Sequence, residues 1–270
     1  MWMVQRAYFC HAGYQAEDDA KAEQCAPILA IEKPGVKDTF KRELRPLLVH
    51  LVRDVYSDRL TAIKKLRVLL AGDGRRTGKK RRNFLVVIGI LDIGLDIRSP
   101  KHRFTTILTP DGETYPELEL ILPDLDKEIA DLQERGLDVE GVHREVEFHL
   151  CADWKLLNTV TGLAAAHANI FCPWCLATKD ERRGVTNGSA EPRSDDVWEM
   201  VTTGSDADRR KYGHKYKPLL PSIPPSRVWL DPLHLLLRAG DTLQGLLLED
   251  VAALYKEDKG VVDRLEAASA

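Results

Sequence analysis

No stretch of the sequence approaches the roughly 18 consecutive apolar residues of a membrane span, and Met1 to Arg6 lack the charged and then apolar layout of a signal peptide. Cysteine is scarce, with five in 270 residues. An odd number that includes one CxxC pair favours metal binding or free thiols over a disulfide framework. The net charge is only −3, so any affinity for nucleic acid must come from a local patch. These absences predict a protein of a reducing, intracellular compartment without a membrane partner.

The composition that remains is typical of a globular protein, with 44% hydrophobic and 30% charged residues. A chain of this length forms one large domain or two ordinary ones. The pattern predicts an irregular lead-in over 1–35, a helical segment over 36–65, a core over 66–168 and a helical, cysteine-containing insertion over 169–270.

Apolar residues recur at helical spacing from Phe40 to Leu60, which predicts a helix with Asp38 as its N-cap and a kink at Pro46. Three strand candidates follow, and their short connections predict an antiparallel meander. They cover 66–71, 83–91 and 104–109.

An amphipathic helix is predicted from Pro116 to Arg135, ending at Gly136, and Pro123 either bends it or marks its true start. A fourth strand, Glu145 to Cys151, alternates apolar and polar residues. Three strands, a helix and a fourth strand are the opening of the ribonuclease H fold, in which the fourth strand lies parallel to the first and beside it. We therefore expect an α/β fold with a ribonuclease H-like mixed sheet and an α-helical insertion.

Two aspartates close adjacent strands of this predicted sheet. Asp73 follows the first strand and Asp153 follows the fourth, and parallel neighbours end at the same edge, about 4.8 Å apart. Paired carboxylates bind Mg²⁺ or Mn²⁺ well, and two such ions support phosphoryl transfer. Gly72 and Gly74 would let a phosphate backbone approach. Taken alone, Asp73 between two glycines is a common turn residue, and only the pairing with Asp153 favours a metal site.

A basic octet directly follows Asp73 and is expected to form a hairpin tip. Six cations there repel one another unless a counter-ion is near, and the backbone of DNA is the natural one. A nuclear-import patch and a solvated turn are the alternatives. The six cations are Arg75, Arg76, Lys79, Lys80, Arg81 and Arg82.

The CxxC pair, Cys172 and Cys175, follows a helix expected from Trp154 to His167. Its spacing suits two thiolates on one Zn²⁺, although a closed site needs four ligands. A redox pair would have to lie within a βαβ unit, so half of a zinc site is favoured. His167 and His214 are within reach as further ligands.

Other residues have a plainer interpretation beside the metal one. Asp231 before Pro232 is expected to cap an apolar helix, with metal binding as the alternative. The lead-in contains Cys10, His11 and Cys25, which we interpret as unstructured thiols and a histidine near the terminus rather than as a metal site.

The order Ala-Gly-Asp73-Gly, Asp153 and Cys172-Pro-Trp-Cys175 resembles the catalytic core of the V(D)J recombination-activating recombinase and the Transib-type transposases. Pro221-Ser-Ile through Asp231-Pro-Leu-His234 is similar to a further segment of that family, and the resemblance covers residues from Arg67 to about Tyr255. The chain also resembles a group of uncharacterised animal proteins that have Gly-Asp-Gly, Gly-Asp-Trp-Lys and Cys-x-Trp-Cys in the same order.

The resemblance implies a nuclear DDE-type enzyme that hydrolyses and transfers DNA strands. Asp73 and Asp153 would hold Mg²⁺ or Mn²⁺, and Cys172 and Cys175 would hold Zn²⁺. The implied partners are DNA and either a second copy of the chain or a partner subunit. The third carboxylate and two zinc-binding histidines of the family would lie past Ala270, so we expect a fragment or a domesticated copy. A non-catalytic DNA- or protein-binding module and a zinc-stabilised interaction domain are the alternatives.

Overall fold

The computed structural model describes residues 28–31, 38–77, 81–110, 112–164, 167–181 and 190–268. The chain divides into two compact units, one that reaches Leu230 and one that begins at Asp231. The predicted lead-in, with Cys10, His11 and Cys25, lies outside the described residues apart from a short strand at 28–30. Within the described ranges, no helix is both long and apolar enough to cross a membrane.

The first unit is built on a mixed sheet whose order is β1-β2-β5-β4-β3-β7-β6, with β8 also paired to β7. Strands β3, β4 and β5 form the predicted antiparallel meander, and β7 pairs in parallel with β3. The α/β fold with parallel and antiparallel strands is therefore confirmed. The strands are β1 (Ile28–Ala30), β2 (Phe40–Arg42), β3 (Lys65–Thr77), β4 (Arg81–Ile90), β5 (Phe104–Thr109), β6 (Leu137–Val139), β7 (Val142–Ala152) and β8 (Val228–Leu230).

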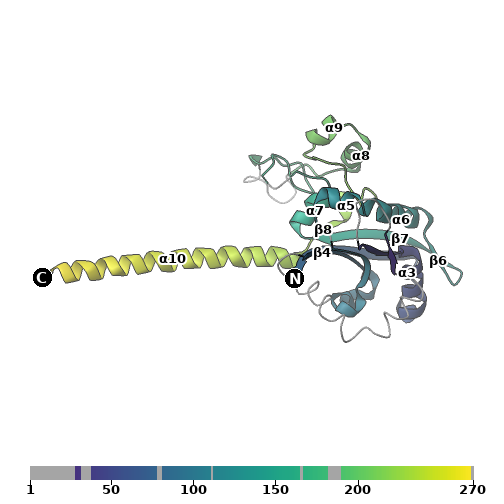
Figure 1. Cartoon of the computed structure of the whole chain (residues 1–270), viewed down its shortest axis with the longest axis horizontal. Helices are drawn as coiled ribbons and strands as arrows, with labels where there is room; N and C mark the ends of the chain where they lie inside the picture. Colours follow the sequence, from purple (N-terminus) through teal and green to yellow (C-terminus); the bar gives the residue numbers. More distant parts are fainter. Residues whose placement is uncertain are drawn as a thin grey trace. The chain divides into compact units, whose positions relative to one another are not determined.

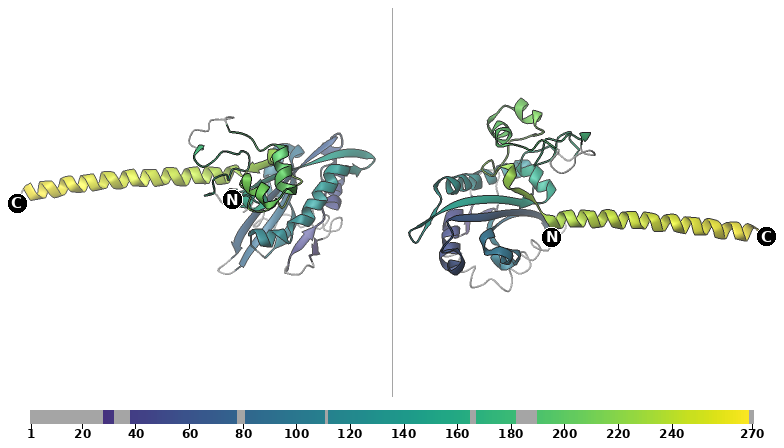
Figure 2. Two further views of the ribbon diagram at one scale, coloured as in Figure 1. Left: turned by 90° about the horizontal axis from the view of Figure 1, so that it is seen from above. Right: turned by 180° about the vertical axis from the view of Figure 1, so that it is seen from behind.

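Helices α5, α6 and α7 lie along one face of this sheet (Figure 1, and again in the right-hand view of Figure 2). The shorter helices connect or flank the strands. The α-helices of this unit are α3 (Leu44–His50), α4 (Ser57–Leu60), α5 (Tyr115–Glu119), α6 (Leu122–Arg135), α7 (Trp154–Val160), α8 (Asp195–Thr203) and α9 (Asp206–Lys211). The other helical turns are η2 (Leu51–Val55), η3 (Leu91–Arg98), η4 (Pro100–His102) and η6 (Pro225–Arg227).

The core lies between the sheet and these helices, because alternate residues of each strand point to the same side. On β7, Val146, Phe148 and Leu150 are buried, as their alternation predicted. On α6, Leu125, Ile129 and Leu132 are buried at spacings of three and four residues, which is the apolar stripe of a helix. The buried residues of β7 and α6 belong to one hydrophobic cluster.

The proline and glycine signals around α6 behave as expected. The predicted helix is divided into α5 and α6, and Pro123 lies in the first turn of α6, where its missing N–H removes no helical hydrogen bond. Gly136 ends α6 with a φ of 67°, a conformation that glycine adopts without strain.

The predicted helix over residues 36–65 needs correction at its beginning. Asp38 is exposed with a φ of 49° and does not cap a helix, since residues 40–42 form strand β2 against β5. Helix α3 begins at Leu44, so Pro46 falls in its first turn and causes no kink. Phe40 stands at helical spacing from Leu44, so residues 40–42 cannot be assigned to a strand without knowledge of the partner strands, β1 and β5.

Two element ends also differ from the prediction. Strand β3 continues to Thr77, because β4 pairs with it through the whole Gly72-Asp73-Gly74 segment, so Asp73 lies inside the strand rather than at its end. Helix α7 ends at Val160 instead of His167, because Gly162 leaves the helix with a φ of 73°.

A tight hairpin between β6 and β7 was not predicted. Glu140 and Gly141 both have positive φ, 54° and 79°, and Val139 pairs with Val142. This is a two-residue turn that follows the right-handed twist of the strands. The second unit contains helix α10 (Pro232–Ala268), which begins at Pro232 as predicted.

Candidate carboxylate site and the cysteine segment

In the parallel pairing of β3 and β7, Asp73 and Asp153 occupy equivalent positions just beyond the paired residues. The pairs run from Lys65 opposite Glu145 to Ala71 opposite Cys151, and the two aspartates follow two residues beyond the last pair. Both residues are half-buried. Sequence reasoning predicted both carboxyl groups at the ends of adjacent parallel strands. The parallel pairing is confirmed, but Asp73 lies inside β3, and the approach of the two carboxyl groups stays a prediction.

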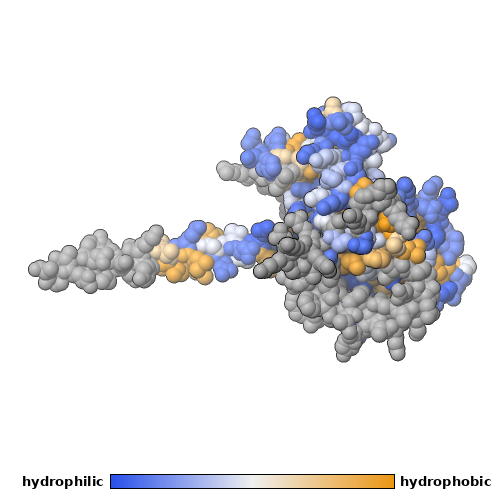
Figure 3. Space-filling model, viewed as in Figure 1, coloured by the Kyte–Doolittle hydropathy of each residue, from blue (hydrophilic) through white to orange (hydrophobic). Residues whose placement is uncertain are grey.

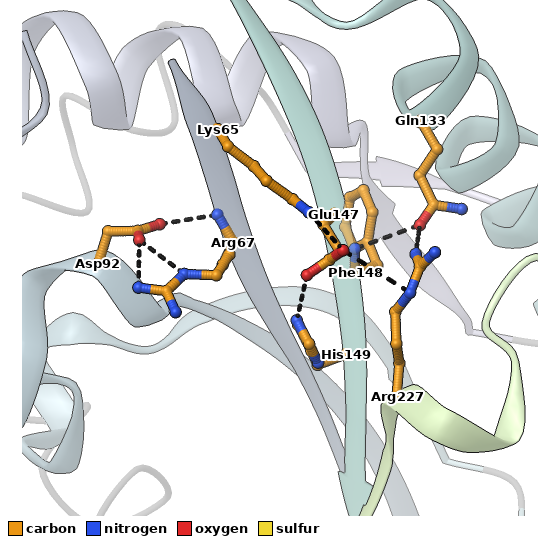
Figure 4. Close-up of polar contacts among 8 residues, drawn as sticks. All are labelled: Lys65, Arg67, Asp92, Gln133, Glu147, Phe148, His149 and Arg227. Carbon is orange, nitrogen blue, oxygen red and sulfur yellow. Dashed lines mark hydrogen bonds and ion pairs between the residues drawn. The ribbon is translucent and has the colours of Figure 1, made fainter. Parts of the chain in front are cut away.

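A network of charged side chains at the other end of β3 and β7 supports this register (Figure 4). Glu147 accepts from Lys65 Nζ at 2.8 Å and lies 3.0 Å from His149 Nε2. The Lys65 ammonium holds the pKa of Glu147 below its usual range. Arg227, just before β8, reaches both Glu147 and Gln133. Because these contacts join β3, β7, α6 and the start of β8, a slip of one residue between the strands would break several of them at once.

Asp153 has a structural task in addition to any ligand role. It is the N-cap of α7, and its Oδ1 accepts a hydrogen bond of 2.7 Å from the backbone N–H of Leu156. Such a cap contributes about 1 kcal/mol. One carboxylate oxygen is thereby committed to the helix, and the other is the one that could face a cation.

The glycines on either side of Asp73 are not open to a ligand, contrary to our expectation. A Cβ at Gly72 would lie 2.9 Å from Leu156 Cδ2, and a Cβ at Gly74 would overlap the side chain of Glu113. Only glycine at position 74 therefore allows Glu113 to pack directly on the strand. A phosphate would have to displace Glu113 before it could approach from this side.

Glu113 is a member of this site that sequence reasoning missed. Its carboxylate is mostly buried, with 11% of the side chain exposed, and its Oε2 lies 2.7 Å from Nζ of Lys155. Lys155 follows Asp153 by two residues, so the ion pair joins the loop before α5 to the start of α7. The signal in the sequence was weak, because nothing in the spacing of Glu113 links it to Gly74.

The donor set at this edge is suited to a divalent cation such as Mg²⁺, which prefers carboxylate oxygens. Asp73 and Asp153 would hold it. Over the described ranges, no three His, Cys, Asp or Glu side chains are grouped closely enough to bind one metal.

The cysteine segment packs beside the start of α7. Trp174, between the two cysteines, donates from Nε1 to the Val228 carbonyl at 2.7 Å, and its ring meets Trp154 edge-on at 5.7 Å. Burial raises the pKa of the Cys172 thiol. These contacts place the CxxC segment next to Trp154, the residue that follows Asp153.

Arg193 is a second residue that the sequence did not identify. It is buried, with 6% of its surface exposed. Its Nε donates to the Cys172 carbonyl at 2.8 Å, and its Nη1 donates to the Tyr212 carbonyl at 2.9 Å and to His214 Nε2 at 3.1 Å. Burial lowers the pKa of Arg193 to about 10, which leaves it charged at neutral pH. The guanidinium group thus joins three separate segments of the insertion.

His214 does not face the thiols as a free ligand. Its Nδ1 donates to the Thr161 carbonyl at 2.8 Å, and its Nε2 accepts from Arg193. The second candidate, His167, is exposed. Cys172 and Cys175 could still hold one side of a Zn²⁺ ion, but His214 would have to exchange its hydrogen bonds to join them.

The buried His214 makes the stability of the insertion dependent on pH. Burial and the nearby Arg193 lower its pKa from the ordinary 6.5 to about 3. Between these values the unfolded chain binds a proton that the folded chain does not, so stability falls as the pH falls below about 6.5. We expect a loss of about 2 kcal/mol at pH 5 relative to pH 7 from this group.

Urea unfolding of the wild type and of His214→Gln at both pH values measures this effect. The variant lacks the titrating group, so its stability should change less between pH 7 and pH 5 by the stated amount. Equal pH dependence of the two proteins would contradict the assignment, whatever their absolute stabilities.

The backbone of Arg75, Arg76, Arg81 and Arg82 forms the end of the β3–β4 hairpin, and Lys79 and Lys80 lie outside the described residues. The positions of these side chains are likewise outside the described part, so the expected contact with DNA stays a prediction.

No protein-family model matches the chain, and the comparison with curated proteins gives no match.

Proposed function

We propose that the chain is a DDE-type transposase- or recombinase-like protein that acts on the phosphodiester bonds of DNA in the nucleus. The order of the elements supports the proposal. An antiparallel meander (β3, β4, β5), a crossover that contains α5 and α6, and a strand (β7) parallel to the first are the arrangement of a ribonuclease H-like core. The resemblance of the Asp73, Asp153 and Cys172–Cys175 motifs to the recombinase family points the same way.

A single observation supports the proposal, namely the parallel register of β3 and β7, in which Asp73 and Asp153 each lie two residues beyond the last pair. The chain between the two residues contains two further strands of the sheet and helices α5 and α6. Two carboxylates from such distant positions would come together at one edge because of this topology. That edge is where a ribonuclease H-like core places its metal ligands.

Each residue of this site would have its own role. Asp73 and Asp153 hold the divalent cations, Mg²⁺ or Mn²⁺, which when bound stabilise charge on the attacking and leaving oxygens of the phosphate. The cap at Leu156 N–H orients the Asp153 carboxylate. Lys155 offers a positive charge to the DNA backbone once Glu113 releases it. Cys172 and Cys175 serve structure, as ligands of Zn²⁺ that fix the insertion.

A non-catalytic DNA-binding module on the same fold is the second candidate, and a specific observation favours it. Glu113 fills the space beside Gly74, and one oxygen of Asp153 is committed to the cap of α7. Both features reduce the room for two cations and a phosphate at this edge.

Nicking of supercoiled DNA in the presence of Mn²⁺ tests the proposal. We expect Asp73→Asn and Asp153→Asn each to lower the nicking rate about 100-fold or more, since a lost ligand removes several kcal/mol of charge stabilisation. Asp138→Asn is the matched control, because this carboxylate is exposed on the β6–β7 hairpin with 74% of its side chain accessible. Nicking that survives in both site variants would remove the catalytic claim and leave the binding module.

A further inference from the structure

The segment from Arg209 to Lys217, here called the basic segment, concentrates positive charge. Its sequence, Arg-Arg-Lys-Tyr-Gly-His-Lys-Tyr-Lys, contains five cations and two tyrosines but no carboxylate. The surface over α8 and α9, where this segment begins, is largely hydrophilic (top of Figure 3). In a chain with a net charge of −3, such a cluster is a local exception.

Four cations of the basic segment are exposed, namely Arg210, Lys211, Lys215 and Lys217. Throughout the described ranges, none of these four has a carboxylate within ion-pair distance, although ion pairs are frequent elsewhere in the unit. Arg209 differs, since it is buried and paired with Asp206. Asp208 is near enough to Lys211 to interact with its charge, but no carboxylate of the described residues neutralises any of the four exposed cations through a direct ion pair.

Contacts with the rest of the unit hold the basic segment in place. The rings of Tyr216 and Tyr115 stack at 4.2 Å with an interplanar angle of 16°. Tyr115 Oη donates to the Lys217 carbonyl at 2.9 Å, and burial raises the pKa of this phenol to about 12, so it stays a donor. The Gly162 carbonyl accepts from the backbone N–H groups of Lys215 and Tyr216. The charges thus sit on an ordered backbone, which lowers the entropic cost of binding a partner.

The same contacts join the basic segment to the carboxylate site. Tyr115 is the first residue of α5 and follows Glu113 by two positions. Glu113 packs on Gly74 and pairs with Lys155. The Tyr115–Tyr216 stack therefore connects the basic segment to the loop that contains Glu113, which packs on the strand of Asp73.

We propose that the basic segment binds the phosphate backbone of DNA and guides it to the carboxylate site. The choice of DNA rests on the proposed function, but the binding itself does not need the two aspartates. Unpaired cations that neutralise phosphates release counter-ions and give an affinity that falls steeply with salt. Two of the cations, Lys211 and Lys215, also lie over tyrosine rings at 5.2 and 4.9 Å, which holds their ammonium groups at the surface.

Fluorescence anisotropy with a labelled DNA duplex, over about 50 to 200 mM salt, tests the inference. The triple variant Lys211→Gln, Lys215→Gln, Lys217→Gln should bind at least 10-fold more weakly at low salt, and the slope of log K against log salt should be smaller by about 2 to 3. The matched control removes three cations elsewhere, with Lys64→Gln, Lys127→Gln and Arg135→Gln. Its affinity should stay within about twofold of the wild type.

A triple variant with Arg at positions 211, 215 and 217 separates charge from folding, and it should keep wild-type binding. Equal affinity of the Gln variant and the control would overturn the inference, and so would an equal loss with Gln and with Arg. If the wild type binds through the basic segment but nicks nothing, the proposed catalysis fails and the binding surface stands.

Discussion

Replacing Arg193 with Ala is expected to lower the free energy of unfolding by about 3–5 kcal/mol. The side chain is buried, and its loss leaves a cavity between the cysteine segment and the segment around His214. It also leaves the Cys172 and Tyr212 carbonyls and His214 Nε2 without their donor. Each buried polar group that loses its partner costs about 1–3 kcal/mol, so the sum exceeds that of an ordinary substitution.

Urea unfolding at pH 7 measures the change, and Arg135→Ala serves as the control. Arg135 pairs with Asp131 on the surface of α6, where 74% of its side chain is exposed, so its loss should cost at most about 0.5 kcal/mol. Arg193→Lys should fall between the two, since one ammonium cannot reach three acceptors on different segments. A cost below about 1 kcal/mol for Arg193→Ala would show that the guanidinium contacts do not hold the insertion together.

Strands β3, β4, β5 and β7 could be predicted from the sequence because their apolar residues form short runs or follow a simple period. Val146, Phe148 and Leu150 alternate with polar neighbours, and this alternation needs no knowledge of the partner strand. The parallel pairing of β7 with β3 then followed from the order of the elements. The equivalent positions of Asp73 and Asp153 beyond the last pair follow from the same topology, and the approach of their carboxyl groups stays a prediction.

The rest of the site depends on contacts that leave no periodic signal. Glu113 reaches Gly74 from a loop, and Arg193 reaches Cys172 from a polar stretch without a periodic pattern. In both cases a single long side chain decides the contact. The extension of β3 through Gly72 and Gly74 was missed because glycines usually mark a turn, whereas here the pairing with β4 overrides that preference.

The CxxC motif identified the two thiols of the candidate zinc site but not its other ligands. The CxxC spacing predicted two neighbouring thiols, and Cys172 and Cys175 are neighbours. The identity of the remaining ligands was left open between His167 and His214. His214 uses both ring nitrogens for other contacts, which only the fold of the insertion could reveal.

Gly162→Ala is expected to lower the free energy of unfolding by about 2–5 kcal/mol. Gly162 has a φ of 73°, where a side chain costs roughly 1–2 kcal/mol. A Cβ here would also overlap the Tyr216 carbonyl oxygen and lie 2.8 Å from that of Lys217. Both obstacles are backbone atoms that the Tyr115–Tyr216 stack and the Tyr115 hydrogen bond hold in place, so they cannot move aside as a side chain would.

Gly141→Ala isolates the first of these two costs, that of the left-handed conformation. Gly141 has a nearly equal φ of 79°, but no atom lies within 4 Å of a Cβ built there. The substitution should therefore cost only the roughly 1–2 kcal/mol of the left-handed conformation. The difference between the two variants in urea unfolding measures how firmly the end of α7 is joined to residues 215–217. Equal costs would mean that the backbone of Tyr216 and Lys217 moves aside to accommodate a methyl group at position 162. The basic segment would then lack the fixed backbone on which its proposed contact with DNA depends.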